Sequence, residues 1–462
     1  MYAFYDFETT GANTAFDQPL QFAAILTDEK FNELETVNIR CRLMPHILPS
    51  PWAMHVTGIT PETLMDKELP TLFEFGAEIQ HLVKRWSPSV WTGYNSISFD
   101  ELVMRQLFYQ NLQPDIYATQ SYGNTRLDIL NIVYATFAFE QEALTWPSKD
   151  TGGFTFKLDK IAPENGFNEH DAHDALGDVR ATIFIAKLIQ NRCPELWENC
   201  VACSNKSFVN SLIEKSSPLS MVFRFGQAPP KQYDVISAGR SWSDGNKVAV
   251  IDLNELDDVE QLNDLSSDAV SEMFKKSPKI IRTFRTNSSP ILRIQKNPSA
   301  AHTFKSEAVA KSPDLREKIA DYITSEYKTE DSPDEIELKI YDNFSSETDK
   351  NILERLRSLT WPERKVEIAK LSDPRFRKLG TRALLLEAPS LLTIKQRLAG
   401  YDYFKDRWIN ASKNKRGWTT FGSVQKQLEE LVKLGLFSEQ KKNSFDVFYS
   451  TREEELKKAF GL

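Results

Sequence analysis

The chain has 462 residues, too many for one ordinary hydrophobic core, so its length predicts two or three domains. Hydrophobic residues make up 41% and charged residues 26% of the sequence, the balance of a soluble globular protein. No apolar run approaches the roughly 20 residues that span a bilayer, and the first residues lack the basic stretch of a secretory signal. We therefore expect a cytoplasmic protein that does not bind membranes.

The net charge of −8 is unevenly distributed along the chain. Residues 351–462 contain 23 Lys and Arg against 14 Asp and Glu, a net charge of +9, which leaves −17 for residues 1–350. A basic C-terminal third can hold a phosphate backbone, and an acidic N-terminal part can carry a carboxylate cluster for metal ions. Two solvated faces of opposite sign would give the same distribution, and we interpret the basic residues 413–418 as a solvated loop.

Four cysteines in a chain of this length are too few for a disulfide framework. Cys200 and Cys203 have the spacing of a zinc or redox pair, but no second pair follows them. We therefore expect structural or incidental thiols at these two positions.

Strand-like and helix-like segments alternate over residues 1–192, which predicts an α/β domain with a central sheet. The predicted strands are residues 2–7, 20–27, 37–43 and 89–94. The predicted helices are residues 71–86, 100–109, 127–137, 156–161 and 175–190.

The character of the sequence changes after residue 192. Short strands separated by polar loops at residues 222–226, 247–253 and 280–284, followed by a helical pattern at residues 306–328, predict a barrel-like β domain with a trailing helix over residues 193–330. Residues 330–335 are acidic and broken by proline, which indicates a linker. Leu, Lys, Arg and Glu at helical spacing predict a helical domain over residues 336–462.

Two carboxylates stand out on the first predicted strand. Residues two apart on a strand point to the same face, so Asp6 and Glu8 present both carboxylates to one point. Carboxylates are rarely buried without a partner, and two of them on an apolar sheet repel each other and call for a cation. Their hard oxygen atoms favour magnesium or manganese. Because Asp-x-Glu also occurs on exposed strands, this pair needs further support.

Three later residues supply that support. Asp100 begins a predicted helix after a strand and a short loop, where an N-cap is the alternative interpretation. His173 lies where a loop enters a helix, and its neutral imidazole can take a proton from water. Asp178 is expected one and a half turns inside that helix, although next to Arg180 it could also belong to a solvated surface. The conjunction predicts a metal site with a general base.

An Asp-x-Glu strand, an Asp at a strand-to-helix junction and a His-x4-Asp motif together resemble the DEDD superfamily of exonucleases, in its histidine-bearing branch. Residues 4–9, 21–25, 93–95 and 172–175 resemble, more narrowly, the bacterial exodeoxyribonuclease I family. The likeness covers nearly the whole chain and is most specific in the first 190 residues. It implies an α/β, ribonuclease H-like exonuclease domain with a mixed sheet, then an SH3-like β domain and an all-helical C-terminal domain.

The resemblance implies a 3′→5′ exonuclease that degrades single-stranded DNA processively to mononucleotides in DNA repair and recombination. It further implies two magnesium ions, for which manganese can substitute, bound by Asp6, Glu8, Asp178 and Asp100. Asp6 is the implied bridging ligand, and His173 is the implied base that deprotonates the attacking water. Glu8 is also expected to touch the terminal 3′ hydroxyl.

The resemblance also implies positions that contact DNA. Lys157 lies where the family typically has an arginine near the 3′-terminal nucleotide, and lysine keeps the charge but loses the bidentate fork. Arg105 could alternatively be a solvated helix charge, and Phe344 a core aromatic. Gln120 and Tyr134 depart from the family's pattern, so they leave the detailed strand path open. The implied substrate-binding residues are Glu8, Lys157, Arg105, Lys206, Asn246, Asn287 and Phe344.

Two alternative functions remain open at this point. A 3′→5′ exoribonuclease or a proofreading-type exonuclease would use the same centre, although such chains usually lack the two additional domains. A non-catalytic scaffold that binds nucleic acid is the other alternative, although such proteins typically lose at least one of the carboxylates. The expected partners are single-stranded DNA and the C-terminal tail of a single-strand-binding protein, and we expect a monomer.

Overall fold

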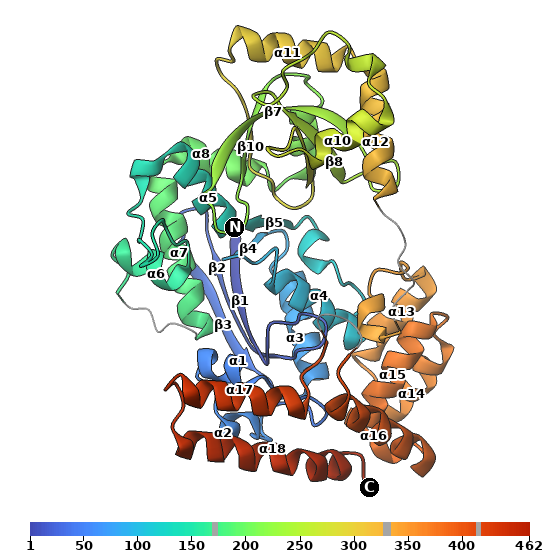
Figure 1. The fold of residues 1–462 in the computed structure, drawn as a ribbon. Coiled ribbons are helices and arrows are strands. Elements are labelled where there is room, and N and C mark those ends of the chain that lie inside the picture. The colour runs from blue at the N-terminus through green and yellow to red at the C-terminus, as the bar shows by residue number, and fades with distance from the viewer. Residues whose placement is uncertain (169–173, 327–333, 413–416) are drawn as a thin grey trace.

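The computed structural model describes residues 1–168, 174–326, 334–412 and 417–462. Within these residues the chain forms two five-stranded sheets and a helical C-terminal region, so the predicted α/β class is confirmed (Figure 1). His173, most of the predicted linker at residues 330–335 and most of the basic loop at residues 413–418 lie outside the described residues.

The first sheet is mixed and carries the Asp-x-Glu pair on its central strand. Its order is β3-β2-β1-β4-β5, in which β1 to β3 are antiparallel and β4 and β5 run parallel to β1. The strands are β1 (Tyr2–Thr9), β2 (Pro19–Thr27), β3 (Glu33–Arg40), β4 (Val90–Gly93) and β5 (Thr125–Asp128).

Helices cover both faces of this sheet (Figure 1). Phe75, Val83 and Leu107 of α3 and α4 pack on one face, and Ile132 and Val179 of α5 and α7 pack on the other, together with α8. The helices of this part are α1 (Pro51–Thr57), α2 (Pro61–Leu64), α3 (Leu72–Arg85), α4 (Asp100–Gln110), α5 (Ile129–Phe139), α6 (Leu158–Glu164), α7 (Ala175–Arg192) and α8 (Pro194–Ala202).

Most predicted elements of this part are confirmed within a few residues. The predicted helix at residues 127–137 is wrong at its start, because residues 125–128 pair with β4 as strand β5. The third strand begins and ends earlier than predicted, at Glu33–Arg40, because it pairs with β2 through residues 33–40. Helix α3 begins one residue later than predicted, where Thr71 and Glu74 form a capping box.

The second sheet is antiparallel throughout, in the order β10-β6-β7-β8-β9. Its central strand, β7, was not predicted from the sequence because the residues of β7 are largely polar.

The predicted single helix at residues 306–328 is wrong, because the chain breaks before Pro313 into α11 and α12. The likeness to an SH3 fold stays a prediction. The elements are α9 (Lys206–Ile213), β6 (Leu219–Phe223), β7 (Lys231–Arg240), β8 (Lys247–Asp252), α10 (Ser267–Lys275), β9 (Ile281–Arg285), β10 (Leu292–Ile294), α11 (Ala300–Ala310) and α12 (Pro313–Ser325).

The two cysteines near the end of α8 are packed into apolar clusters. Cys200 lies under the first sheet with α5 and α7, and Cys203 lies beside the second sheet, where its Sγ donates to the carbonyl of Leu292 at 3.3 Å. Burial raises the pKa of both thiols, that of Cys203 to about 11, so both are neutral and have a packing role.

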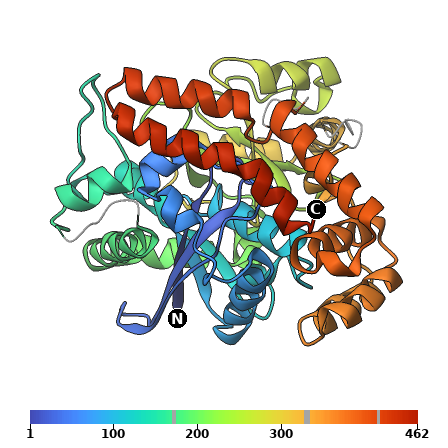
Figure 2. The ribbon, with the colours of Figure 1, turned by 90° about the horizontal axis from the view of Figure 1, so that it is seen from below.

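The C-terminal helices share one core with the first part of the chain. Met54 and Tyr109 pack in the same cluster as Leu379, Leu428 and many other apolar residues of these helices. Figures 1 and 2 show α17 and α18 lying against the segment that contains α1 and α2. The helices are α13 (Glu347–Leu356), α14 (Trp361–Lys370), α15 (Pro374–Glu387), α16 (Ile394–Ile409), α17 (Phe421–Lys433) and α18 (Glu439–Ala459).

Short 3-10 helices complete the secondary structure at Ala118–Gln120, Gln141–Ala143, Leu262–Asp264, Ile336–Lys339 and Pro389–Leu391. Across the described parts of the chain, no helix combines the length and the apolar character that crossing a bilayer requires.

Candidate active site

The acidic pair lies where the apolar face of β1 ends. Tyr2 and Phe4 point into the core beneath α5 and α7, and the same face continues with Asp6 and Glu8. The backbone of these two acids is paired to Ala23 and Gln21 of β2, which fixes both side chains on the central strand. The predicted alternative of an exposed strand is wrong, because β1 has neighbouring strands on both sides.

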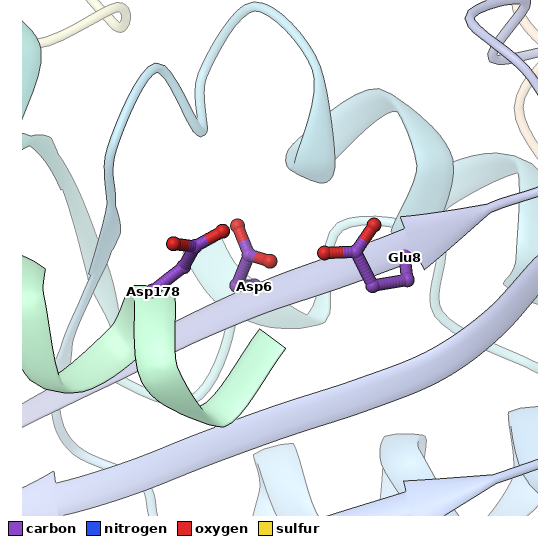
Figure 3. A group of neighbouring side chains, drawn as sticks. All are labelled: Asp6, Glu8 and Asp178. Carbon is purple, nitrogen blue, oxygen red and sulfur yellow. The ribbon is translucent and has the colours of Figure 1, made fainter. Parts of the chain in front are cut away.

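Asp178 joins this pair from the adjacent helix. It lies in the first turn of α7, not one and a half turns inside as predicted, because the helix begins at Ala175. Helix α7 packs along β1, and the carboxylates of Asp6, Glu8 and Asp178 have oxygen atoms within 4.8 Å of one another (Figure 3). The predicted alternative of a solvated helix surface is therefore wrong for Asp178.

Asp100 reaches the same region from α4, which packs on the opposite face of the first sheet from α7. It is the first residue of α4, with Phe99 in the N-cap position, so the N-cap interpretation is wrong. Its Oδ1 accepts a hydrogen bond of 3.0 Å from the amide of Phe7, between the two acids on β1. This bond fixes α4 to the central strand and places a fourth carboxylate within the electric field of the other three.

Mutual repulsion and burial make these acids reluctant to ionise. Burial, then the neighbouring carboxylates, raise the pKa of Asp6 well above its ordinary value. Burial and then the charge of Asp178 raise the pKa of Glu8 to about 8. Burial raises the pKa of Asp100 to about 8, against the lowering effect of the Phe7 hydrogen bond. A cluster of hard oxygen donors that resist carrying negative charge together fits a divalent cation, which would hold them ionised.

Two further acids organise the site and were not predicted from the sequence. Asp174 accepts hydrogen bonds from Gln21 at 2.9 Å and Arg40 at 3.3 Å, which anchors the start of α7 to β2 and β3. It also adds to the charge that raises the pKa of Asp6 and Glu8. Its place directly after His173 was visible in the sequence, but its partners come from distant strands.

The second missed acid is Asp128, at the end of β5. Its carboxylate accepts hydrogen bonds from the amides of Asn95 at 2.9 Å, Ile97 at 3.1 Å and Leu130 at 3.0 Å. The bonds from Asn95 and Ile97 hold the loop that leads into Asp100, and burial raises the pKa of Asp128 to about 6. An Asp just before a helical pattern signals an N-cap, which it is for α5, but the pattern does not reveal its hold on the loop.

The structure spreads the predicted DNA contacts over three parts of the chain. Lys157 is the exposed N-cap of α6, and Lys206 is the exposed first residue of α9. Asn246 and Asn287 lie in neighbouring loops at one end of the second sheet, where the Thr286 amide donates to the Asn246 carbonyl at 2.9 Å. Within the described residues, the side-chain oxygen of Asn246 is buried without a hydrogen-bond partner.

The remaining two predicted contacts lie near an aromatic cavity of about 360 Å³ between the 109–122 segment and the C-terminal region. Phe344 lines this cavity and is 88% exposed, so the core alternative for Phe344 is wrong. Tyr117, Tyr122 and Tyr341 line it too. Arg105 lies behind it: its guanidinium stacks on Tyr117 at 4.8 Å and is only 13% exposed, so the solvated alternative for Arg105 is wrong.

The two departures from the family's pattern have local roles. Tyr134 accepts a hydrogen bond of 2.7 Å from Arg224, which also stacks over Phe156. Gln120 ends a short 3-10 helix in the 109–122 segment. Neither residue lies in the acidic cluster, so the departures leave the arrangement of the acids unaffected.

Comparison with known proteins connects this geometry to a family. Residues 3–186 match the family described as "Exonuclease", and residues 334–450 match "Exonuclease I C-terminal domain". The exodeoxyribonuclease I of Haemophilus influenzae is 32% identical over 77% of this chain and 79% of its own length. That of Escherichia coli is 29% identical over 76% of this chain and 77% of its own length.

Solved structures extend the likeness to almost the whole chain. A moderately thermophilic exonuclease I from Methylocaldum szegediense superposes with a TM-score of 0.84 at 26% identity, covering 98% of this chain and 99% of its own. Exonuclease I of E. coli in complex with a dT13 oligonucleotide superposes with a TM-score of 0.81 at 25% identity, with the same coverage. The fold with its mixed first sheet and helical C-terminal region is therefore that of these enzymes.

The raised pKa of Glu8 generates a prediction for the metal-free protein. The folded state holds a proton on Glu8 up to a pH of about 8, whereas the unfolded state releases it near the ordinary 4.5. The free energy of unfolding therefore falls as pH rises between these values, and Glu8→Gln removes the part of this dependence that Glu8 contributes. Above pH 8 and without metal, we expect the variant to be more stable than the native chain by about 1–4 kcal/mol.

Chemical unfolding at a series of pH values, with a chelator and then with excess Mg²⁺, measures this difference. Below about pH 4 the two proteins should be equally stable. Mg²⁺ should reverse the order at high pH, because only the native chain then gains the bound ion. Equal stability of the two proteins at every pH without metal would contradict the repulsion described above.

Proposed function

The chain belongs to the exodeoxyribonuclease I family, and we propose that it degrades single-stranded DNA processively from the 3′ end to deoxynucleoside 5′-monophosphates. The convergence of Asp6, Glu8 and Asp178 on one point at the end of the central strand carries this proposal. The oligonucleotide bound by the E. coli enzyme supports a single-stranded substrate. We assign the activity to DNA repair and recombination, in keeping with the resemblance in sequence.

We assign two Mg²⁺ ions, replaceable by Mn²⁺, to the acidic cluster. Asp6, Glu8 and Asp178 would hold them, with Asp6 between the two ions, and Asp100 would bind directly or through water. Bound divalent ions supply charge to the scissile phosphate and the leaving oxygen, and they lower the pKa of water. The donor set fits, because the raised pKa values of Asp6, Glu8 and Asp100 show that these acids, crowded beside Asp178, need positive charge to ionise together.

The chain's own groups orient the substrate and move the proton. His173 is the proposed base that takes the proton from the attacking water, and it lies outside the described residues. Glu8 is proposed to accept a hydrogen bond from the terminal 3′ hydroxyl, which selects a free 3′ end. Lys157 is proposed to pair with a phosphate near that end, from its exposed place at the start of α6.

We propose that the DNA strand leaves the active site between the part around the first sheet, the part around the second sheet and the C-terminal region. Lys206 would neutralise a phosphate, and Asn246 and Asn287 would offer amide groups from the end of the second sheet. The cavity lined by Phe344 is large enough to admit bases, and its exposed aromatic rings suit stacking of any base. Arg105 supports the far wall of this cavity through Tyr117 and Tyr341 and adds positive charge there.

We also propose a monomer that binds the C-terminal tail of a single-strand-binding protein. Support comes from a solved relative, at 26% identity and a TM-score of 0.80, described as a complex of such a protein with exonuclease I and an inhibitor. The exoribonuclease alternative has less support, because the curated relatives cited above are exodeoxyribonucleases. The scaffold alternative is wrong, because the chain is an exodeoxyribonuclease I-type hydrolase.

Loss of one proposed metal ligand should separate hydrolysis from DNA binding. We expect Asp178→Asn to lower kcat by at least about 10³-fold, because the amide cannot supply the charge that neutralises the cation. The dissociation constant for single-stranded DNA in Ca²⁺ should change little, since the strand is held mainly elsewhere. Asp314→Asn, in the first turn of α12, is the matched control and should keep full activity. Full activity of Asp178→Asn would reject the proposed metal site.

Removal of the exposed ring at the aromatic cavity should weaken DNA binding. Base stacking on an aromatic side chain is worth about 1–3 kcal/mol, so we expect Phe344→Ala to raise the dissociation constant for a long single strand about 5–150-fold. Fluorescence anisotropy with a labelled oligonucleotide measures this change. Val366→Ala, at another exposed apolar position of the C-terminal region, is the control. Unchanged affinity in Phe344→Ala would place the strand elsewhere.

A further inference from the structure

A further buried carboxylate lies beside the proposed active site but belongs to a separate network. Glu101 follows Asp100 on α4, and its side chain is 1% exposed. It pairs with Arg105 at 2.9 Å and with Arg126 at 3.2 Å. The Thr119 hydroxyl donates to it at 2.8 Å, and the Tyr5 hydroxyl lies 3.4 Å from it. One carboxylate thus holds two arginines from different elements.

Each arginine also donates a hydrogen bond to one of the two outer parts of the molecule, which are the second sheet and the C-terminal region. Arg126, on β5, donates through Nη2 to the carbonyl of Asn287 at 2.6 Å, in the loop after β9 of the second sheet. Arg105 donates through Nη1 to the hydroxyl of Tyr341 at 3.4 Å, in the C-terminal region. The second sheet and the C-terminal region are therefore both tied, through arginines, to the one buried charge of Glu101.

The position of Glu101 connects these ties to the proposed site. The preceding residue, Asp100, is fixed to the amide of Phe7 on the strand that carries the acidic pair. The same turn of α4 therefore holds a proposed active-site acid and the anchor for both outer parts. The ends of the two ties, Asn287 and Tyr341, lie respectively at a predicted DNA contact and in the aromatic cavity wall.

The ion pairs of Arg105 and Arg126 both depend on the negative charge of Glu101. The two guanidinium groups are largely buried, with 13% and 8% of their side chains exposed, and they share the one carboxylate. Removal of a partner from a buried ion pair leaves an uncompensated charge, which moves toward water. Without Glu101, both arginines would leave the geometry in which they reach Asn287 and Tyr341.

We propose that Glu101 is a positioning residue that keeps the second sheet and the C-terminal region closed around the strand and so sets the number of nucleotides removed per binding event. This inference rests on the proposed function, because it assigns a role in the same reaction. It predicts that loss of the Glu101 charge shortens the run of successive cleavages without impairing a single cleavage near the 3′ end.

Two substrates separate these effects in the variant Glu101→Gln, which keeps the shape of the side chain and removes its charge. On a long single strand with a free 3′ end and excess unlabelled competitor, we expect the run length to fall about tenfold, equivalent to about 1.4 kcal/mol between stepping and release. On a trinucleotide, which is too short to reach the outer parts, we expect an unchanged kcat. Arg126→Lys keeps a positive charge beside Glu101 but lacks the second nitrogen that reaches Asn287, and it should shorten the run in the same way.

Asp252→Asn is the matched control, since Asp252 is a buried carboxylate paired with Arg282 at 3.5 Å within the second sheet alone. Its run length should equal that of the native chain, even where its stability is lower. The inference is overturned by a native run length in folded Glu101→Gln or Arg126→Lys, by an equal loss of kcat on the trinucleotide, or by an equally short run in Asp252→Asn. Should Glu101→Gln fail to fold, Arg126→Lys alone decides. A native chain that releases no nucleotides from either substrate would instead reject the proposed function.

Discussion

Repulsion among buried carboxylates at the end of β1 is the constraint on which the site depends. Asp6 and Glu8 share one face of a central strand, and α7 brings Asp178 against them. The raised pKa values of Asp6 and Glu8 show that the fold holds these acids together at a cost in stability. Natural proteins retain such a cost where function needs it, and a divalent cation removes it.

Hydrogen bonds from the surrounding elements hold this group of acids in place. The acids are fixed from several directions: Asp100 is tied to the amide of Phe7, and Asp174 is tied to β2 and β3. Asp128 holds the loop before α4. The outer parts are tied to α4 through Glu101, so that the proposed substrate-binding residues and the proposed metal ligands are connected through one helix. Precise placement of this kind is what the proposed metal-assisted reaction requires.

The sequence predicts the parts of this site that depend on local periodicity. The period of two on a strand places Asp6 and Glu8 on one face, and the start of a helical pattern marks Asp100. Depth within a helix is less accessible: the predicted one and a half turns for Asp178 count from His173, whereas α7 begins at Ala175 and places Asp178 in its first turn. Partners that come from distant elements cannot be read from spacing. The pairing of Glu101 with Arg105 follows from their i,i+4 spacing, whereas the ties from Arg126 to Asn287 and from Arg105 to Tyr341 require the folded chain.

The central claim is that this chain removes nucleotides from the 3′ end of single-stranded DNA with the help of divalent cations. Digestion of one oligonucleotide labelled at either end, with Mg²⁺ or with a chelator, tests it most directly. We expect the 3′ label to be released at once as a mononucleotide, the 5′ label to stay on the shortening strand, and the chelator to stop both processes. Early release of the 5′ label as a mononucleotide, or full digestion in the chelator, would contradict the account.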